Sequence, residues 1–170
     1  SAELGVTFNY ADYTFNGQGD STTLNQIAAQ LVDDGVDVVV PIATPAAQAC
    51  AAETEDIPIV LTAVTDPAAS GLVETNEQPG GNVTGVSDLG PIEAQLELLL
   101  KLVPDAKAVG TIYNSSEINS KYQVDIFKKA AEKRGVQVLE ATVSNVNDIQ
   151  QAAASLNGKV QGMWLPTDNV

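Results

Sequence analysis

The chain has 170 residues, of which 44% are hydrophobic and 18% charged, a composition that fits one globular domain or two small ones and excludes a disordered chain. Its formal net charge of −14 excludes nucleic acids and anionic membrane surfaces as favourable partners, because both are bound through clustered Lys and Arg. With no His and one Cys, the chain lacks the residues for Ser-His-Asp catalysis and for the common zinc sites.

The charged residues are divided unevenly along the chain. Residues 1–100 contain 15 acidic and no basic residues, whereas residues 101–170 contain all eight basic residues and seven acidic ones. This asymmetry predicts two halves with separate surfaces. No apolar stretch approaches the roughly 18 residues needed to cross a bilayer, and the sequence does not start with a signal-peptide pattern, so we expect a soluble chain.

The first predicted elements are a strand at residues 3–10 and, after a Gly-rich break, an amphipathic helix at residues 22–34. Asp20 or Ser21 suits the N-cap of this helix, and Gly35 directly follows its end. Its predicted apolar stripe consists of Leu24, Ile27, Ala28, Leu31 and Val32.

Two apolar runs with a helix between them come next. Residues 36–43, VDVVVPIA, are nearly continuous in apolar side chains, which is typical of a strand buried on both faces of a parallel sheet. Residues 44–53 are predicted to form a helix with proline in its first turn, and residues 57–64 a second buried strand. Turn-forming residues dominate 69–81, and a short strand is predicted at 81–89.

The second half continues the alternation of helices and strands, which indicates parallel βαβ units with right-handed crossovers. In a long helix predicted at residues 115–135, Ile118, Tyr122, Ile126 and Ala130 recur every four residues and are expected to face the core. The remaining predicted elements are helices at 91–103 and 146–158 and strands at 106–114, 137–143 and 160–166.

Several kinds of chemistry find no support in the sequence. Neither the glycine motif of dinucleotide sites nor the P-loop motif follows a strand, so no cofactor is indicated. No spacing singles out a pair of carboxylates for acid-base catalysis. Cys50, in an Ala-rich helix, and Trp164, in the last strand, are predicted to be buried core residues.

The loops beyond the carboxyl ends of the predicted strands are the candidate site, because ligands of open parallel sheets collect there. These loops are rich in neutral hydrogen-bonding side chains. The helix that begins at Thr44 offers free backbone N–H groups to a carboxylate, and Asp66 or Asp168 suits an ammonium group. The sequence therefore favours a small zwitterionic ligand. The loops cover residues 43–45, 64–67, 113–120 and 166–169.

Each of these loops also has a purely structural interpretation. Thr44 with the following proline could be an N-cap and first-turn proline, and Asp66 could initiate a turn. Ser115 and Ser116 resemble N-caps of the long helix that follows them. Asp168 has the weakest structural alternative, since its segment ends the chain.

Several stretches resemble one family, the substrate-binding proteins of ABC transporters of the tryptophan and tyrosine uptake type. The matching pieces are GDSTTLNQIAAQLVDDGVDVVVPIATPAAQA, IPIVLTAVTDP, GGNVTGVSDL, QLELLLKLVPDAKAVGTIYNSSEINS and VLEATVSNVNDIQQAAASLNGKVQGMWLPTDN. The resemblance implies a periplasmic-binding-protein fold of the first type, with two doubly wound α/β parallel-sheet lobes at residues 1–86 and 87–170. Because members of the family are nearly twice as long, we expect both lobes to be incomplete.

The resemblance also implies a function and a set of binding positions. We expect an extracytoplasmic receptor, periplasmic or lipid-anchored, that captures an amino acid-like and aromatic ligand between the lobes and presents it to a membrane permease. A sensor domain of a signalling protein, an enzyme of the doubly wound class, and pairing of two copies through strand edges remain alternatives. The implied ligand-binding residues are Thr44, Pro45, Ala46, Ala47, Thr65, Asp66, Asn114, Ser115, Ser116, Asn119 and Asp168.

Overall fold

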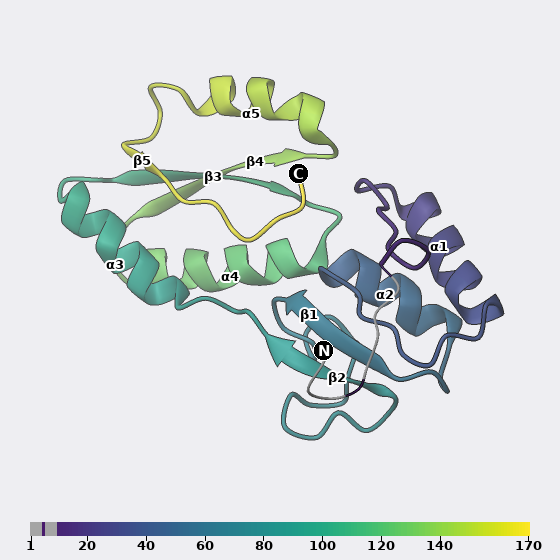
Figure 1. Cartoon of the computed structure of the whole chain (residues 1–170). Helices are drawn as coiled ribbons and strands as arrows, with labels where there is room; N and C mark the ends of the chain where they lie inside the picture. The colour runs from purple at the N-terminus through teal and green to yellow at the C-terminus, as the bar shows by residue number, and fades with distance from the viewer. Residues whose placement is uncertain (1–4, 6–9) are drawn as a thin grey trace.

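The computed structural model describes residue 5 and residues 10–170, so the strand predicted at residues 3–10 lies almost entirely outside the described residues. In the described part, helices and parallel strands form two bodies (Figure 1). One contains a sheet of two strands, in the order β1-β2, and the other a sheet of three strands, in the order β4-β3-β5. Each sheet has its own cluster of buried apolar side chains, and the α/β class predicted from the sequence is confirmed.

Helix α1, Ser21–Asp33, opens the first body as the sequence predicts. Asp20 is its N-cap, and its Oδ1 accepts a hydrogen bond of 2.7 Å from the backbone N–H of Thr23. After the helix, Gly35 has φ +65, a left-handed conformation that favours glycine and ends the helix. Of the predicted stripe, Ala28 is buried in the core cluster, and Leu24 and Leu31 are partly buried and pack against the same cluster.

The apolar segment 36–43 differs from the prediction that it is a strand buried on both faces. It pairs in parallel with β1, Ile59–Val64, only through two isolated bridges. Pro41 has no N–H to donate, so the ladder to β1 is interrupted at its centre. Burial alternates along the segment, because only one face lies on the core. The exposed apolar side chains of this sheet are Val38, Val40, Ile42, Val60 and Val86.

The first body is completed by helix α2, Thr44–Glu53, and strand β2, Val83–Ser87. Proline lies in the first turn of α2, as predicted, and Cys50 is buried against the core. Strand β2 pairs with β1 in parallel, with the register Ile59 to Val83, and the register shifts between Leu61 and Val64. This irregularity lies directly before the loop that carries Asp66.

In the second body, the three-stranded sheet lies between α5 on one face and α3 and α4 on the other (Figure 1). Strand β3 is in the middle and is buried along nearly its whole length, as expected for a central parallel strand. Trp164 stacks on Phe127 at 4.2 Å and donates a hydrogen bond of 2.8 Å to Gln95 Oε1, which confirms it as a core residue. The elements are α3 (Ile92–Leu102), β3 (Ala108–Asn114), α4 (Ile118–Glu132), β4 (Gln137–Val143), the short 3-10 turn η2 (Val146–Asp148), α5 (Ile149–Leu156) and β5 (Gly162–Met163).

The core-facing side of α4 is not the stripe that the sequence predicts. Of the four predicted residues, Ala130 is buried, Tyr122 and Ile126 are half-buried, and Ile118 is exposed. The predicted residues, spaced four apart, form a stripe that lies beside the buried face of the helix. Three positions of the buried face are polar. The residues that α4 buries are Asn119, Ser120, Gln123, Val124, Phe127, Ala130 and Ala131.

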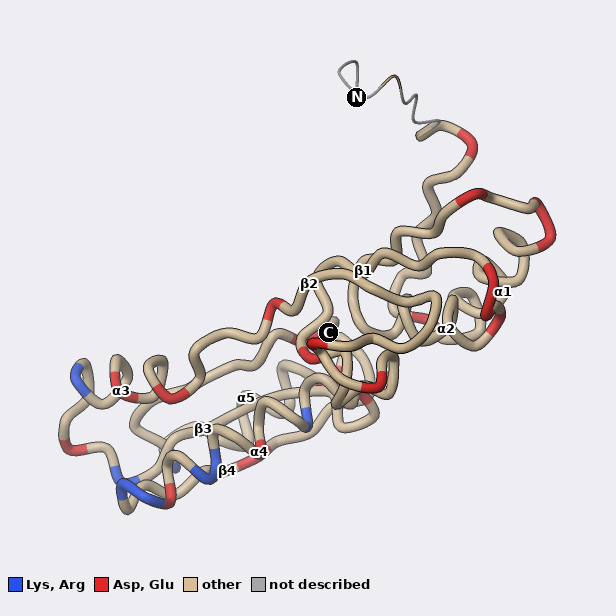
Figure 2. Tube along the Cα trace, turned by 90° about the horizontal axis from the view of Figure 1, so that it is seen from below, with Lys and Arg blue, Asp and Glu red and all other residues tan. Residues whose placement is uncertain are grey.

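The acidic and basic residues are distributed between the two bodies as the sequence indicates. Figure 2 shows Lys and Arg only in the part of the chain that carries α3, α4 and the three-stranded sheet. In the body with α1 and α2, all charged side chains are acidic. Within the described residues, no helix is both long enough and apolar enough to cross a membrane.

Candidate functional site

The candidate site is the region where the strand tips of the two bodies meet. The carboxyl ends of β1 and β3, the N-terminal turn of α4 and the C-terminal segment all reach this region (Figure 1). One side-chain hydrogen bond crosses between the bodies here, from Gln123 Nε2 to Thr65 Oγ1 at 3.5 Å, and burial together with the Asp66 carboxylate raises the pKa of the Tyr122 hydroxyl. The loops from the two halves are therefore neighbours.

Asp168 lies at the tip of β3, where it organises the backbone. Its Oδ2 accepts a hydrogen bond of 2.9 Å from the backbone N–H of Asn114, and its Oδ1 accepts one of 3.0 Å from that of Val170. The side chain of Asn114 is buried and accepts hydrogen bonds from the N–H and the hydroxyl of Ser116 at 3.0 and 2.7 Å. Three of the predicted binding residues are therefore joined by direct contacts.

The two serines of this loop are not the N-caps that the sequence suggests. Helix α4 begins one residue later than that interpretation requires, with Glu117 as its N-cap and no capping hydrogen bond from a side chain. Ser116 turns back to Asn114, and Ser115 is exposed. Neither serine therefore caps the helix.

Glu117 was not predicted as a site residue, but it lies at the centre of this cluster. Its Oε1 accepts a hydrogen bond of 3.4 Å from Asn114 Nδ2, and its Oε2 accepts hydrogen bonds from Asn119 Nδ2, at 3.2 Å, and from Asn169 Nδ2. Burial raises the pKa of the Glu117 carboxyl above its ordinary value; the hydrogen bond from Asn169 works against this rise, and the negative charge of Asp168 adds to it.

Gln123 is a second residue of this region that the sequence did not single out. Its side chain is buried, and its Nε2 donates to the carbonyl oxygens of Asn119 at 3.2 Å and Thr167 at 2.9 Å. Asn119 and Gln123 are four residues apart on α4, a spacing that puts both side chains on one face. Its position four residues after the predicted Asn119, next to a strand-tip loop, is the signal that could have identified Gln123.

Asp66 serves mainly as a structural acceptor of its own loop. Its Oδ1 accepts hydrogen bonds from the backbone N–H of Ala69 at 3.0 Å and from Asn76 Nδ2 at 3.1 Å. Partial burial opposes ionisation, but these hydrogen bonds and the interaction with Tyr122 outweigh it, and the pKa of Asp66 lies below its ordinary value. The alternative that Asp66 initiates a turn is confirmed, and the neighbouring Thr65 is buried.

The helix N-terminus predicted as a carboxylate site belongs to α2. Thr44 is the first helical residue and is 2% exposed, whereas Ala43 is the N-cap, so Thr44 does not cap the helix. Ala43 has φ 76 and ψ 157, a conformation that alanine rarely adopts. Pro45 and Ala46 are half-buried and Ala47 is buried. In the described part of the chain, no hydrogen bond joins residues 44–47 to the loops of the second half.

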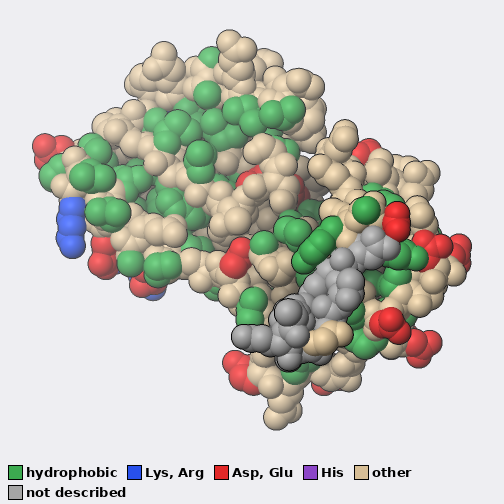
Figure 3. Space-filling view, in the orientation of Figure 1, with side chains coloured by type: hydrophobic (Ala, Val, Ile, Leu, Met, Phe, Trp, Pro, Cys, Tyr) green, Lys and Arg blue, Asp and Glu red, His purple; other side chains and the backbone are tan. Residues whose placement is uncertain are grey.

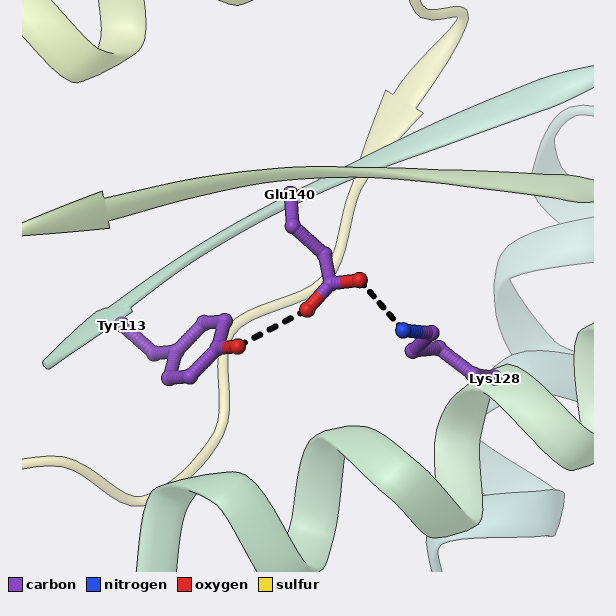
Figure 4. A network of polar contacts seen from close by, with 3 residues as sticks. All are labelled: Tyr113, Lys128 and Glu140. Carbon is purple, nitrogen blue, oxygen red and sulfur yellow. Dashed lines mark hydrogen bonds and ion pairs between the residues drawn. The ribbon is translucent and has the colours of Figure 1, made fainter. Parts of the chain in front are cut away.

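A network behind the site holds β3, β4 and α4 together. The hydroxyl of Tyr113 donates a hydrogen bond of 2.8 Å to Glu140 Oε2, and Lys128 pairs with Glu140 Oε1 (Figure 4). Burial of Glu140 opposes its ionisation, but the contacts with Lys128 and Tyr113 prevail and lower its pKa. Burial and the Glu140 carboxylate raise the pKa of Tyr113 to about 12. Tyr113, the residue before Asn114, is thereby held in place by its hydrogen bond to Glu140.

The site offers many hydrogen-bond acceptors and few cations. Figure 3 shows acidic side chains where the two halves meet and basic ones at the far end of the second half. The ion pairs of the described residues are Lys128 with Glu140 and Arg134 with Glu97, and neither involves the strand-tip loops. No group of three or more potential metal ligands is present among the described residues. The arrangement suits a small ligand that carries its own positive charge.

Comparison with known proteins gives a consistent result. The chain is 47% identical over 155 residues to a tyrosine-binding protein of Clostridioides difficile, covering 91% of this chain and 45% of that protein. It superposes with a TM-score of 0.92 on an ABC domain in complex with L-Trp from Streptococcus pneumonia, at 43% identity, covering 98% of this chain and 57% of that one.

A third relative superposes less closely on this chain. The ligand-free, open structure of a Clostridium difficile substrate-binding protein with adhesive properties is 46% identical, covering 88% of this chain and 51% of that one, but its TM-score is only 0.57.

The chain spans about half the length of the relatives it matches. Its fold is that of the type I periplasmic binding proteins. The family model for ABC transporter substrate-binding proteins matches residues 3–170, and the chain therefore belongs to the ABC transporter substrate-binding protein family.

Proposed function

We propose that this chain is the solute-binding component of an ABC importer and that it captures an aromatic amino acid between two lobes, residues 1–86 and 87–170. The observation that carries the proposal is the contact between the two halves at the strand tips, where Gln123 Nε2 donates to Thr65 Oγ1 at 3.5 Å. Loops that close on each other in this way enclose a ligand placed between them.

The ligand class follows from the relatives and from the charges of the site. One relative is a tyrosine-binding protein and another was solved with L-Trp, and both are more than 40% identical to this chain. An amino acid brings an ammonium group to a region of acidic and carbonyl oxygens. Its carboxylate suits the N-terminus of α2, because backbone N–H groups bind an anion there without any Lys or Arg.

The ligand-binding residues in this proposal come from both halves of the chain. The first half supplies the α2 N-terminus and the tip of β1, and the second half supplies the β3 tip, the start of α4 and the C-terminal loop. Among these residues, Asp66 contributes by holding its loop in place. The set is Thr44, Pro45, Ala46, Ala47, Thr65, Asp66, Asn114, Ser115, Ser116, Asn119 and Asp168.

The proposal also includes a partner and a cellular location. The protein acts outside the cytoplasm, either in a periplasm or lipid-anchored at the cell surface, and delivers its ligand to a membrane permease. The proposal assigns the protein a binding role and no catalytic step, in keeping with a family described as substrate-binding. The permease recognises the closed form, so ligand binding and delivery are coupled through lobe closure.

A thermal-shift series with the twenty amino acids tests the proposal on the protein as it is expressed from its gene. L-tryptophan or L-tyrosine at 100 times its dissociation constant is expected to stabilise the protein by about 2.7 kcal/mol. Isothermal titration then gives the affinity of each ligand that shifts the melting temperature. If none of the aromatic amino acids shifts the melting temperature at millimolar concentration, the proposed ligand class is wrong.

A further inference from the structure

Asparagine followed by glycine occurs twice in the chain, at Asn16–Gly17 and at Asn157–Gly158. An asparagine is most reactive in this context, because glycine has no Cβ atom to shield its backbone nitrogen from the side-chain amide of the residue before it. Attack of that nitrogen on the amide carbon starts deamidation. A folded protein permits the attack only where the pair is free to rotate, and the two pairs differ in this respect.

Asn157 and Gly158 form the exposed turn that follows α5. Asn157 is the C-cap of the helix. Gly158 has φ +72, and no atom beyond its chain neighbours lies within 4 Å of the place where a Cβ would be. Within the described residues, neither the side chain of Asn157 nor the N–H of Gly158 makes a hydrogen bond. Both reacting groups are therefore open to solvent and held by no partner in this part of the chain.

The turn has little to hold it in its present conformation. Because ψ of Asn157 is 130, the Gly158 nitrogen is turned away from the Asn157 amide carbon, and Asn157 must rotate about its Cα–C bond before the two atoms meet. The rotation breaks the hydrogen bond of 3.1 Å from the Lys159 N–H to the Leu156 carbonyl oxygen, which closes the turn. A single exposed hydrogen bond at the end of a helix opens frequently.

Asn16 is held in place, although it too is exposed. Its Oδ1 accepts a hydrogen bond of 2.8 Å from the N–H of Gln18, which keeps the amide in its own turn. Gly17 is buried, and a Cβ at this position would lie 2.4 Å from Leu24 Cδ2. The Gly17 carbonyl oxygen also accepts a hydrogen bond of 2.9 Å from the N–H of Asp20, the N-cap of α1. Rotation of this pair would therefore disturb the start of α1.

We infer that Asn157 is a site of spontaneous covalent modification, in which it becomes aspartate or isoaspartate, and that the fold protects Asn16 from the same reaction. The Gly158 nitrogen bonds to the Asn157 amide carbon, the bond from that carbon to the amide nitrogen breaks, and ammonia leaves with the proton of the Gly158 nitrogen. Water then opens the cyclic imide at either of its two C–N bonds. The sum is loss of ammonia and gain of water, with no other reactant and no ligand involved.

The product differs from the original protein in charge and in backbone. It has a new carboxylate one residue beyond α5, at the negative end of the helix dipole, where a negative charge is unfavourable. Isoaspartate also lengthens the main chain between α5 and β5. The extra charge is expected to make the modified protein elute later from an anion-exchange column.

The test incubates the protein, as it is expressed from its gene, in ligand-free buffer at pH 8 and 37 °C and follows both pairs by peptide mapping. Trypsin releases residues 135–159, whereas chymotrypsin is needed around Asn16, because residues 1–100 contain no Lys or Arg. A mass increase of about 1 Da that grows with time is expected at Asn157 and not at Asn16, with fragment spectra assigning the position. Asn157→Gln is expected to lose the increase, since glutamine would have to form a larger ring.

The same incubation in concentrated urea is the matched control. In the unfolded chain the two pairs lose their different surroundings and are expected to react at similar rates. A mass increase confined to Asn157 in the folded protein, and present at both pairs in urea, supports the inference. Similar rates at both pairs in the folded protein, a faster reaction at Asn16, or no reaction at Asn157 would each overturn it.

Discussion

Gln123 and Thr167 are joined by two hydrogen bonds although they are 44 residues apart: Gln123 Nε2 donates to the Thr167 carbonyl oxygen at 2.9 Å, and the Thr167 N–H donates to Gln123 Oε1 at 3.0 Å. The amide side chain thus pairs with the peptide group as a neighbouring strand would. Because Gln123 also reaches Thr65 at 3.5 Å, one buried side chain connects α4, the C-terminal loop and the first half of the chain.

Gln123→Ala is expected to lower the free energy of unfolding by about 1–3 kcal/mol, because the variant leaves polar groups of Thr167 without partners. Urea unfolding followed by circular dichroism measures the change. Gln151→Ala, at an exposed position on α5, is the control and should stay within about 0.5 kcal/mol of the wild type. Equal effects of the two substitutions would show that the paired hydrogen bonds contribute nothing to stability.

The fold class and most elements could be predicted from local patterns. The N-cap at Asp20, the proline in the first turn of α2 and the run of strand β3 depend on neighbouring residues in the sequence, and the structure confirms them. The segment 36–43 could not be predicted correctly, because burial of its second face depends on which element packs there. An apolar run alone does not contain that information.

The contacts around the candidate site could be predicted only in part, for a different physical reason. Asn114, Ser116 and Asp168 follow strands directly, so the sheet topology brings them together. Gln123, which was not predicted, is a polar residue on the buried face of α4, and its partner Thr167 lies 44 residues away. Hydrophobic periodicity assigns a buried polar residue of this kind to the exposed face of the helix, since it counts only apolar residues.

Asp168→Ala is expected to weaken binding, besides removing the acceptor of the Asn114 and Val170 N–H groups, whereas Asp66→Ala is expected to act mainly on stability. Asp168→Ala should weaken binding of an aromatic amino acid by at least about 1.5 kcal/mol, because a charged acceptor near the ammonium group is lost. Asp66→Ala should instead lower the free energy of unfolding, since the N–H of Ala69 and the amide of Asn76 lose their acceptor. Isothermal titration and urea unfolding of both variants measure this. The reverse pattern would assign the ammonium group to Asp66.

The pKa of Tyr113 predicts a loss of stability at alkaline pH. Burial, the hydrogen bond to Glu140 and nearby negative charges raise the pKa to about 12 in the folded protein, above the ordinary value of about 10. The folded state therefore holds the phenol proton more tightly than the unfolded state does, so this contribution is complete below pH 10 and is lost as the pH rises through about 12. Urea unfolding between pH 8 and pH 11.5 measures the decline. In Tyr113→Phe the decline should be smaller, and an identical decline would contradict the prediction.

Ala43→Gly is expected to stabilise the protein, because Ala43 has φ 76 and ψ 157 at the N-cap of α2. This region of conformational space costs a residue with a Cβ atom about 1–3 kcal/mol, whereas glycine adopts it freely. Glycine also makes the unfolded chain more flexible, which offsets about 0.4–1 kcal/mol of the gain. A net gain of about 1 kcal/mol in urea unfolding is expected. Ala52→Gly, at an exposed position of the same helix, should instead cost about 0.5–1 kcal/mol, and a similar loss in Ala43→Gly would show that the backbone at Ala43 is not strained.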